Sequence, residues 1–409
     1  TLAQSNLTNV LGSIVTTDGT SEATTGNLII NSSNAVNFNS TVNINDITID
    51  NSNSVEFVNN VSANDVLIND SQADSNINFS GSLIANSINA TASTNKYNIK
   101  LSDDTVIGES AMFLNSGDLQ LGSIQSDVIT FNNGFSHTEG DNEFAGTISS
   151  NDNVINLGTN NVTLIANTII DSGDATITLG SLSVDPDNTN ENSLTFNSGL
   201  LQVDGDLIVN GDLTINATVQ FDENNEGDNT ISSLSGALMI NDVNNADHLK
   251  LDAQTGITIN DSTDITANQL TLDNVSGDIL INNDITAMNI NIDNEEGAFI
   301  LNSTITATFV AANEETGIEG VDSVINITAT DLNMGLDESA TGSIIADNVT
   351  LTAANSQKLI FQSDYLYGAT ISGSDVADEL TLAENDLNKD AFILTYNEFE
   401  NIQSHADAK

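Results

Sequence analysis

The residues that could do chemistry in this chain are mainly oxygen donors, and the densest local group lies at 185–192. This stretch reads Asp-Pro-Asp-Asn-Thr-Asn-Glu-Asn, so oxygen-bearing side chains fall at alternating positions. Calcium takes carboxylate, amide and carbonyl oxygens from loops of this kind. The spacing predicts a calcium loop, and a solvated turn is the alternative interpretation. The predicted ligands are Asp185, Asp187, Thr189 and Glu191.

A second acidic stretch, 222–229, reads Asp-Glu-Asn-Asn-Glu-Gly-Asp-Asn and offers a similar set of oxygens. Neither stretch matches the EF-hand pattern, and the glycine-rich repeat of calcium-loaded β-rolls does not occur. Calcium is therefore the one cofactor that the sequence invites, and the fold is predicted to require none.

Catalytic motifs of the common enzyme classes are absent from the sequence. His137, His248 and His405 lie far apart in polar surroundings without zinc-hydrolase spacing, so each is predicted to be a surface residue. Glycoside hydrolysis needs two carboxylates about 5 to 10 Å apart, and 58 Asp and Glu residues supply such pairs by chance. The adjacent Asp103 and Asp104 would point to opposite faces of a strand. We expect a protein that is not an enzyme.

The charge of the chain excludes several partners. Its 409 residues include 58 Asp and Glu against 6 Lys and Arg, a formal net charge of -52. Binding to phosphate depends on Lys and Arg, so we expect neither nucleic acid nor an anionic membrane surface as a partner. Acidic polysaccharides would be repelled in the same way. No stretch approaches the roughly 18 consecutive apolar residues that span a membrane, so membrane insertion is not expected.

The same composition suggests where the protein works. Salt and divalent cations outside a cell screen self-repulsion, so extreme acidity favours an extracellular or cell-surface location. The first residue is Thr1, which a removed secretory signal peptide would explain. The absence of Cys fits a reducing compartment as well as a secreted protein without disulfides.

Short strands are the elements that would position these side chains. Apolar residues alternate with polar ones, and turn-forming pairs such as Asn-Ser and Gly-Asp break the runs. Alternation of this kind predicts strands with one buried face. The alternating pairs include Ile47 and Ile49, Val55 and Phe57, Ile77 and Phe79, Leu213 and Ile215, Leu270 and Leu272, and Ile290 and Ile292.

A degenerate repeat of wandering length runs along the chain. Extra residues can bulge out at the corners of a solenoid, which therefore tolerates a variable period. The matches are 45–50 with 64–69 (offset 19), 265–273 with 285–293 (offset 20), 55–57 with 77–79 (offset 22) and 329–332 with 346–349 (offset 17).

A repeat of about 20 residues fits a β-helix rung better than a propeller blade, which needs roughly 40 to 50. We predict an all-β, single-chain parallel β-helix (β-solenoid) of about 17–20 rungs. Asn is expected at its corners because it tolerates positive φ and can pass amide hydrogen bonds along the axis. Buried corners should favour Asn over Asp, whose like charges would stack.

Residues 28–361 are predicted to form the β-helix body. Residues 1–27 and 362–409 depart from the rung rhythm and are predicted to be a cap or an assembly segment at each end. The stretch from Asp375 is richer in Glu, Leu, Tyr and Phe, and a helix or a last irregular rung would fit it.

The run VDGDLIVNGDLTINATVQF, from Val203 to Phe221, and the block from Ile265 to Val310 resemble repeats of secreted right-handed β-helix proteins. These are the haemagglutinin-like adhesins and autotransporter passenger regions of bacteria, and phage tail-fibre repeats are similar. The resemblance covers roughly 28–361 and implies a rigid surface rod used for adhesion or assembly. It carries over no catalytic residues. The chain departs from the autotransporter pattern in having no amphipathic β-barrel at its C-terminus, so we expect either that this part is cleaved or that secretion follows another route.

Together these observations predict a non-enzymatic extracellular rod that joins copies of itself head to tail in a surface filament or matrix. The alternative is an adhesin or phage-fibre-like rod that binds a surface glycan. A carbohydrate-active β-helix enzyme ranks third.

Overall fold

The computed structural model describes a chain built of β-strands, with no helix among the described residues. It separates into two compact units, Thr1–Asp204 and Gly205–Lys409. The described residues are 8–10, 14–15, 26–32, 34–109, 111–182, 190–222, 228–244, 246–260, 265–301, 303–307, 324–334, 343–345, 348–353, 359–361, 369–373, 378–382, 395–397 and 399–404.

In the first unit the strands pair in parallel with strands one turn along the chain, in three faces. Face 1 contains β1 (Thr8–Val10), β4 (Val36–Phe38), β7 (Val55–Phe57), β10 (Asn76–Phe79), β13 (Asn98–Leu101), β16 (Leu119–Leu121) and the first parts of β19 (Asn142–Ser149) and β21 (Val162–Asp171). Face 2 contains β2 (Ile14–Val15), β5 (Val42–Asn43), β8 (Val61–Ser62), β11 (Leu83–Ala85), β14 (Thr105–Ile107), β17 (Val128–Phe131), the second parts of β19 and β21, and the first part of β23 (Leu194–Val203). Face 3 contains β3 (Asn27–Ser32), β6 (Asp46–Ser52), β9 (Asp65–Ile68), β12 (Ser87–Ala90), β15 (Ala111–Phe113), β18 (Phe135–His137), β20 (Ile155–Asn156), β22 (Thr176–Leu179) and the end of β23.

The second unit follows the same plan. Its first ladder contains β24 (Leu207–Val209), β26 (Asp228–Ser233), β28 (Ala246–Ala253), β30 (Ile265–Asn274), β33 (Asn289–Leu301), β35 (Val324–Met334), β37 (Asn348–Ala353), β39 (Ala369–Gly373) and β41 (Thr395–Asn397). A second ladder contains β25 (Leu213–Phe221), β27 (Leu238–Asn244), β29 (Ile257–Ile259), β31 (Ile279–Ile281), the ends of β33 and β35, β38 (Leu359–Phe361), β40 (Asp378–Leu382) and β42 (Phe399–Ser404). A third contains the start of β30, β32 (Ile285–Ala287), β34 (Thr304–Ala307) and β36 (Ser343–Ile345).

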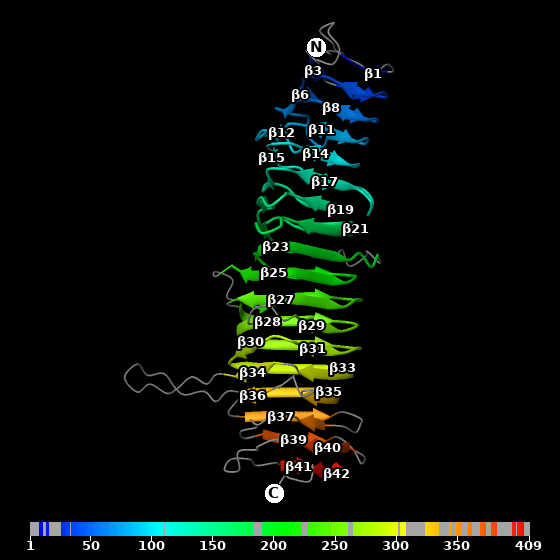
Figure 1. Ribbon diagram of the computed structural model, residues 1–409. Coiled ribbons are helices and arrows are strands. Elements are labelled where there is room, and N and C mark those ends of the chain that lie inside the picture. The colour runs from blue at the N-terminus through cyan, green and yellow to red at the C-terminus, as the bar shows by residue number, and fades with distance from the viewer. Residues whose placement is uncertain are drawn as a thin grey trace, which may run out of the picture. The chain divides into compact units, whose positions relative to one another are not determined.

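This architecture is a parallel β-solenoid, as predicted, and within each unit the strands stack in successive layers (Figure 1). Most of the predicted repeat matches are register partners. Ile47 lies opposite Val66 at an offset of 19, and Val55 lies opposite Ile77 at an offset of 22. Ile265 lies opposite Ile285 at an offset of 20.

One predicted match is wrong. Ala329 lies opposite Ala353, which is an offset of 24 and not of 17. A match of only four residues is too short to fix a register where the connection between two strands varies in length.

The core forms from the alternating aliphatic and aromatic residues. Ile47 and Ile49 are fully buried, and Thr48 between them is partly exposed. Phe38, Phe57 and Phe79 occupy one position in three successive rungs. Their rings stack with centroids 4.7 and 4.8 Å apart, close to the strand spacing of a sheet.

The predicted role of Asn at corners is confirmed for hydrogen bonding and not for backbone conformation. Amides donate along the axis from Asn98 to Asn76 at 3.2 Å and from Asn274 to Asn294 at 2.9 Å. Among the described residues other than Gly, positive φ occurs at Asp74, Asn151 and Asp152. Asn151 is therefore the one described Asn with the positive φ that was predicted for corners.

The described parts of the two predicted end segments contain strands. β1 pairs with β4, and β42 pairs with β40, both in parallel. For the stretch from Asp375, the described residues are strand and not helix.

Candidate functional site

The predicted calcium loop lies mostly outside the described residues, which leave out Asp185, Asp187 and Thr189. Glu191 is described, and its side chain is exposed. Residues 223–227 of the second acidic stretch also lie outside the described part. Both calcium loops therefore remain predictions.

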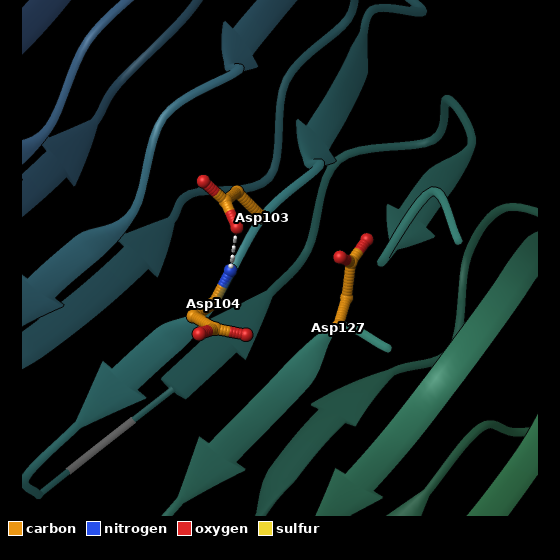
Figure 2. Close-up of side chains that lie close together, drawn as sticks. All are labelled: Asp103, Asp104 and Asp127. Carbon is orange, nitrogen blue, oxygen red and sulfur yellow. Dashed lines mark hydrogen bonds between the residues drawn. The ribbon is translucent and has the colours of Figure 1, made fainter. Parts of the chain in front are cut away.

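The structure brings together a different acidic group, Asp103, Asp104 and Asp127 (Figure 2). One carboxylate oxygen from each residue lies within 4.8 Å of the others. Asp103 and Asp104 form the corner between β13 and β14, and Asp127 occupies the corresponding corner one rung later, just before β17. The parallel register that places Thr105 opposite Ile129 holds these two corners side by side.

Asp127 is the buried member of this group, with 5% of its surface exposed. Its Oδ2 accepts hydrogen bonds from the backbone N–H groups of Ser123 at 2.7 Å and Ile124 at 3.0 Å. The Ser123 hydroxyl donates to the same oxygen at 3.1 Å. This carboxylate therefore closes its own turn.

The other two carboxylates also bond to the backbone. Asp104 Oδ1 accepts from the N–H of Val128 at 2.9 Å, and Asp103 Oδ1 accepts from the N–H of Asp104 at 2.8 Å. Three carboxylates are suitable donors for a divalent cation, but they provide only part of the 6 to 8 oxygens that calcium takes. Every contact described here is explained by corner formation without a cation.

The sequence pattern predicts Asp103 and Asp104 to be neighbours on a strand and does not place Asp127 beside them. The structure places the pair on a corner, where strand alternation does not apply. The missed signal was the repeat itself, because Asp127 follows Asp103 by 24 residues, about one rung of the coil.

The prediction that His137 is a surface residue is wrong, since its side chain is fully buried. It ends β18 opposite Phe113, two positions after the buried Phe135, and so points inward. The Nδ1 atom lies 2.9 Å from Asn142 Oδ1, and the Nε2 atom lies 3.1 Å from the Gly117 carbonyl oxygen. Burial lowers the pKa of His137, although these hydrogen bonds and Asp118 act in the opposite direction.

His137 and Asn142 form a polar pair at two core positions that neighbouring rungs fill with apolar residues. Asn142 lies opposite Leu119 on one side and Val162 on the other. A neutral imidazole has one N–H, so it donates to the Gly117 carbonyl or to the Asn142 amide oxygen, but not to both. This pair is a structural feature of the core, sealed from solvent.

The other histidines differ. His248 is partly exposed, and its Nδ1 lies 2.7 Å from Asp228 Oδ1, as expected for a surface residue. His405 lies outside the described residues.

In the second unit, Lys250 lies between two carboxylates. Its Nζ is 3.2 Å from Asp252 and 3.1 Å from Asp273, which are register partners. Asp293 continues the same row, so aspartates do stack here, at positions that are partly exposed for Asp252 and Asp273 and exposed for Asp293. Burial disfavours the charged amine, but the hydrogen bonds to Asp273 and Asp252 outweigh it and raise the pKa of Lys250.

Comparison with protein-family models, with curated proteins and with solved structures finds no match to this chain. None of the described segments is a helix with the length and apolar character to cross a membrane.

Proposed function

We propose that this chain is a non-enzymatic structural protein of the cell exterior, which builds a filament or matrix by joining copies end to end. The observation that supports this proposal is the parallel ladder that runs through each unit. Every rung uses the backbone N–H and C=O groups of the rung before it, and such a ladder can be extended by any further strand that presents the same edge.

The outermost described strands offer such edges. Within the described residues, β1 has a single strand partner, β4, and β42 has a single partner, β40. The free side of each strand presents backbone groups without a described ladder partner. Contact between the start of one copy and the end of another is heterologous and does not close on itself, so it would propagate.

The chemistry of the described side chains agrees with a mechanical role. The carboxylates of the acidic group bond to the backbone of their own corners, and the buried His137 is sealed in the core. With a net charge of -52, copies of the chain would associate only where salt screens their repulsion, as it does outside cells.

Electron microscopy of the purified chain tests the proposal. Long fibres that grow with protein concentration and salt would support it, and particles of single-chain length under all conditions would contradict it. Outward residues of a rung donate their backbone N–H to the preceding rung, as Asn98 does to the Ser75 carbonyl oxygen. Asn9 in β1 is the register partner of the outward Asn37, so its N–H faces the free edge. Asn9→Pro removes this N–H and should shorten the fibres, and Asn9→Ala keeps it and should leave fibre length unchanged.

A further inference from the structure

Face 2 of the first unit carries an uncharged row of outward side chains. Along β8, β11, β14, β17 and the second parts of β19 and β21, the outward positions hold no Asp, Glu or Lys before Asp171. We call these residues the neutral face. They are Ser62, Ile84, Val106, Val128, Thr130, Thr147, Ser149 and Ile169.

Four aliphatic side chains of the neutral face are solvent-exposed. Ile84 is 57% exposed and lies directly opposite Val106, which is 42% exposed. Val128 is 45% exposed, and Ile169, two rungs further along the same row, is 39% exposed. Single exposed aliphatic residues are ordinary, but a group on adjacent strands of one face marks an interaction site.

Face 1 of the same unit is different. Its outward row includes Glu56, Lys100 and Glu143, and no large apolar side chain of that row is exposed. Both faces are built from the same kind of parallel strand ladder. The lack of charge and the exposed aliphatic side chains of the neutral face are therefore a property of its sequence and do not follow from the fold.

The charge of the chain indicates which kind of partner would bind the neutral face. A cationic partner would select the carboxylate-rich corners, and nucleic acid or an anionic membrane would be repelled. A sugar ring stacks on exposed aromatic side chains, but the exposed large apolar residues in the described part of the chain are all aliphatic or Met. If two copies of this chain meet through their neutral faces, the side chains in direct contact are uncharged on both copies.

We propose that the neutral face is where two copies of the chain pack side by side. Asp104, opposite Val128 at the edge of the face, and Asp171 at its far end place carboxylates around the contact. Their repulsion is screened by salt, so the association strengthens as ionic strength rises. This lateral contact uses side chains and is independent of the end-to-end contact, which uses backbone edges.

Sedimentation velocity of the full chain over a wide range of protein concentrations tests the proposal, at about 0.1 M and about 1 M NaCl. The wild type should form dimers more readily at the higher salt. The double variant Ile84→Asp/Val106→Asp should weaken dimerisation by at least about tenfold. The matched control is Met112→Asp, because Met112 is 45% exposed on face 3. This control should dimerise like the wild type.

The proposal would be overturned if the wild type stayed monomeric at every concentration and salt, or if the double variant dimerised like the wild type. It would also be overturned if the double variant and the control lost dimerisation equally. Binding of the wild type, but not of the double variant, to neutral glucan beads would overturn it as well, because the neutral face would then be a glycan site. Far-UV circular dichroism and urea unfolding establish that each variant is folded. Micrographs separate the two proposals. If fibres of the double variant still lengthen but no longer lie side by side, only the lateral contact has been lost, and if the wild type dimerises without lengthening, only the end-to-end proposal fails.

Discussion

At the scale of single residues, the inward and outward positions of a rung differ sharply in what they tolerate. Ile47 is fully buried, and Thr48 beside it is partly exposed. We expect Ile47→Asp to lower the free energy of unfolding by several kcal/mol, since it places an unpaired charge in the core. Thr48→Asp should cost less than about 1 kcal/mol. Urea unfolding of both variants measures the difference, and equal effects would contradict the strand assignment.

The buried His137 predicts a pH dependence. Its pKa in the folded chain is lowered by burial, whereas the unfolded chain binds a proton near pH 6.5. The unfolded state therefore holds more protons in the window between these two pKa values. The contribution of His137 to stability is fully present above about pH 6.5 and is lost as the pH falls below it.

The double variant His137→Leu/Asn142→Leu provides the comparison, because it restores apolar residues at both positions. Replacing both partners of a buried hydrogen bond can be neutral or stabilising. The free energy of unfolding of the double variant, minus that of the wild type, should increase as urea titrations move from pH 8 to pH 5. Protonation of the many carboxylates affects both chains alike. A difference that stays constant over this range would show that His137 does not titrate in the core.

His137 also shows which residue-scale features sequence could predict. Alternation correctly identified the inward residues from Ile47 to Ile292 because they are apolar and the pattern is self-consistent. The same alternation, counted from Phe135, would have placed His137 inside. Its polar neighbours outweighed that signal in the prediction, and a single sequence does not reveal that Asn142 is available as a partner.

At the scale of the rung, close contact between corners restricts side-chain size. A Cβ added to Gly117 would lie 1.9 Å from the Tyr97 carbonyl oxygen in the rung below. The nearest atom to a Cβ at Gly108 is 3.4 Å away and belongs to the Asn86 side chain. We expect Gly117→Ala to destabilise the chain by several kcal/mol and Gly108→Ala by less than about 1 kcal/mol.

Thermal and urea unfolding of these two variants test whether the corners stack as described. The two substitutions add the same methyl group, and neither glycine has a positive φ. The difference between the unfolding midpoints of the two variants therefore reports how much space lies between rungs at each glycine. Similar unfolding midpoints would mean that the backbone at Gly117 can move away from Tyr97 at little cost.

Register between rungs was predictable where the repeats are long or apolar. The nine-residue match from Ile265 to Ile285 gave the correct partners, and the match from Val55 to Ile77 did so with aromatic support at Phe79. The short match at Ala329 failed. Asp127 was missed as a neighbour of Asp103 for a related reason, because proximity between corners follows from register and not from local sequence.

At the scale of the whole molecule, the net charge of -52 on 409 residues is the dominant electrostatic property. The described Lys residues offset little of it, and Lys250 is already shared between Asp252 and Asp273. Self-repulsion favours the unfolded chain, where charges lie further apart. Salt should therefore stabilise the fold.

Salt titration can distinguish general screening from a specific cation site. We expect the urea midpoint to rise as NaCl increases from about 0.01 M to about 1 M, over which the Debye length falls from roughly 30 Å to 3 Å. Since each carboxylate of the acidic group already bonds to the backbone, calcium and magnesium should act alike at equal ionic strength. Asp103→Asn should leave that response unchanged, because the Asp103 carboxylate accepts a hydrogen bond from the N–H of Asp104, and an amide oxygen can accept the same bond. A calcium-selective rise in the midpoint that disappears in Asp103→Asn would instead show that the corner of Asp103, Asp104 and Asp127 binds the ion, and that the remaining ligands come from backbone oxygens or water.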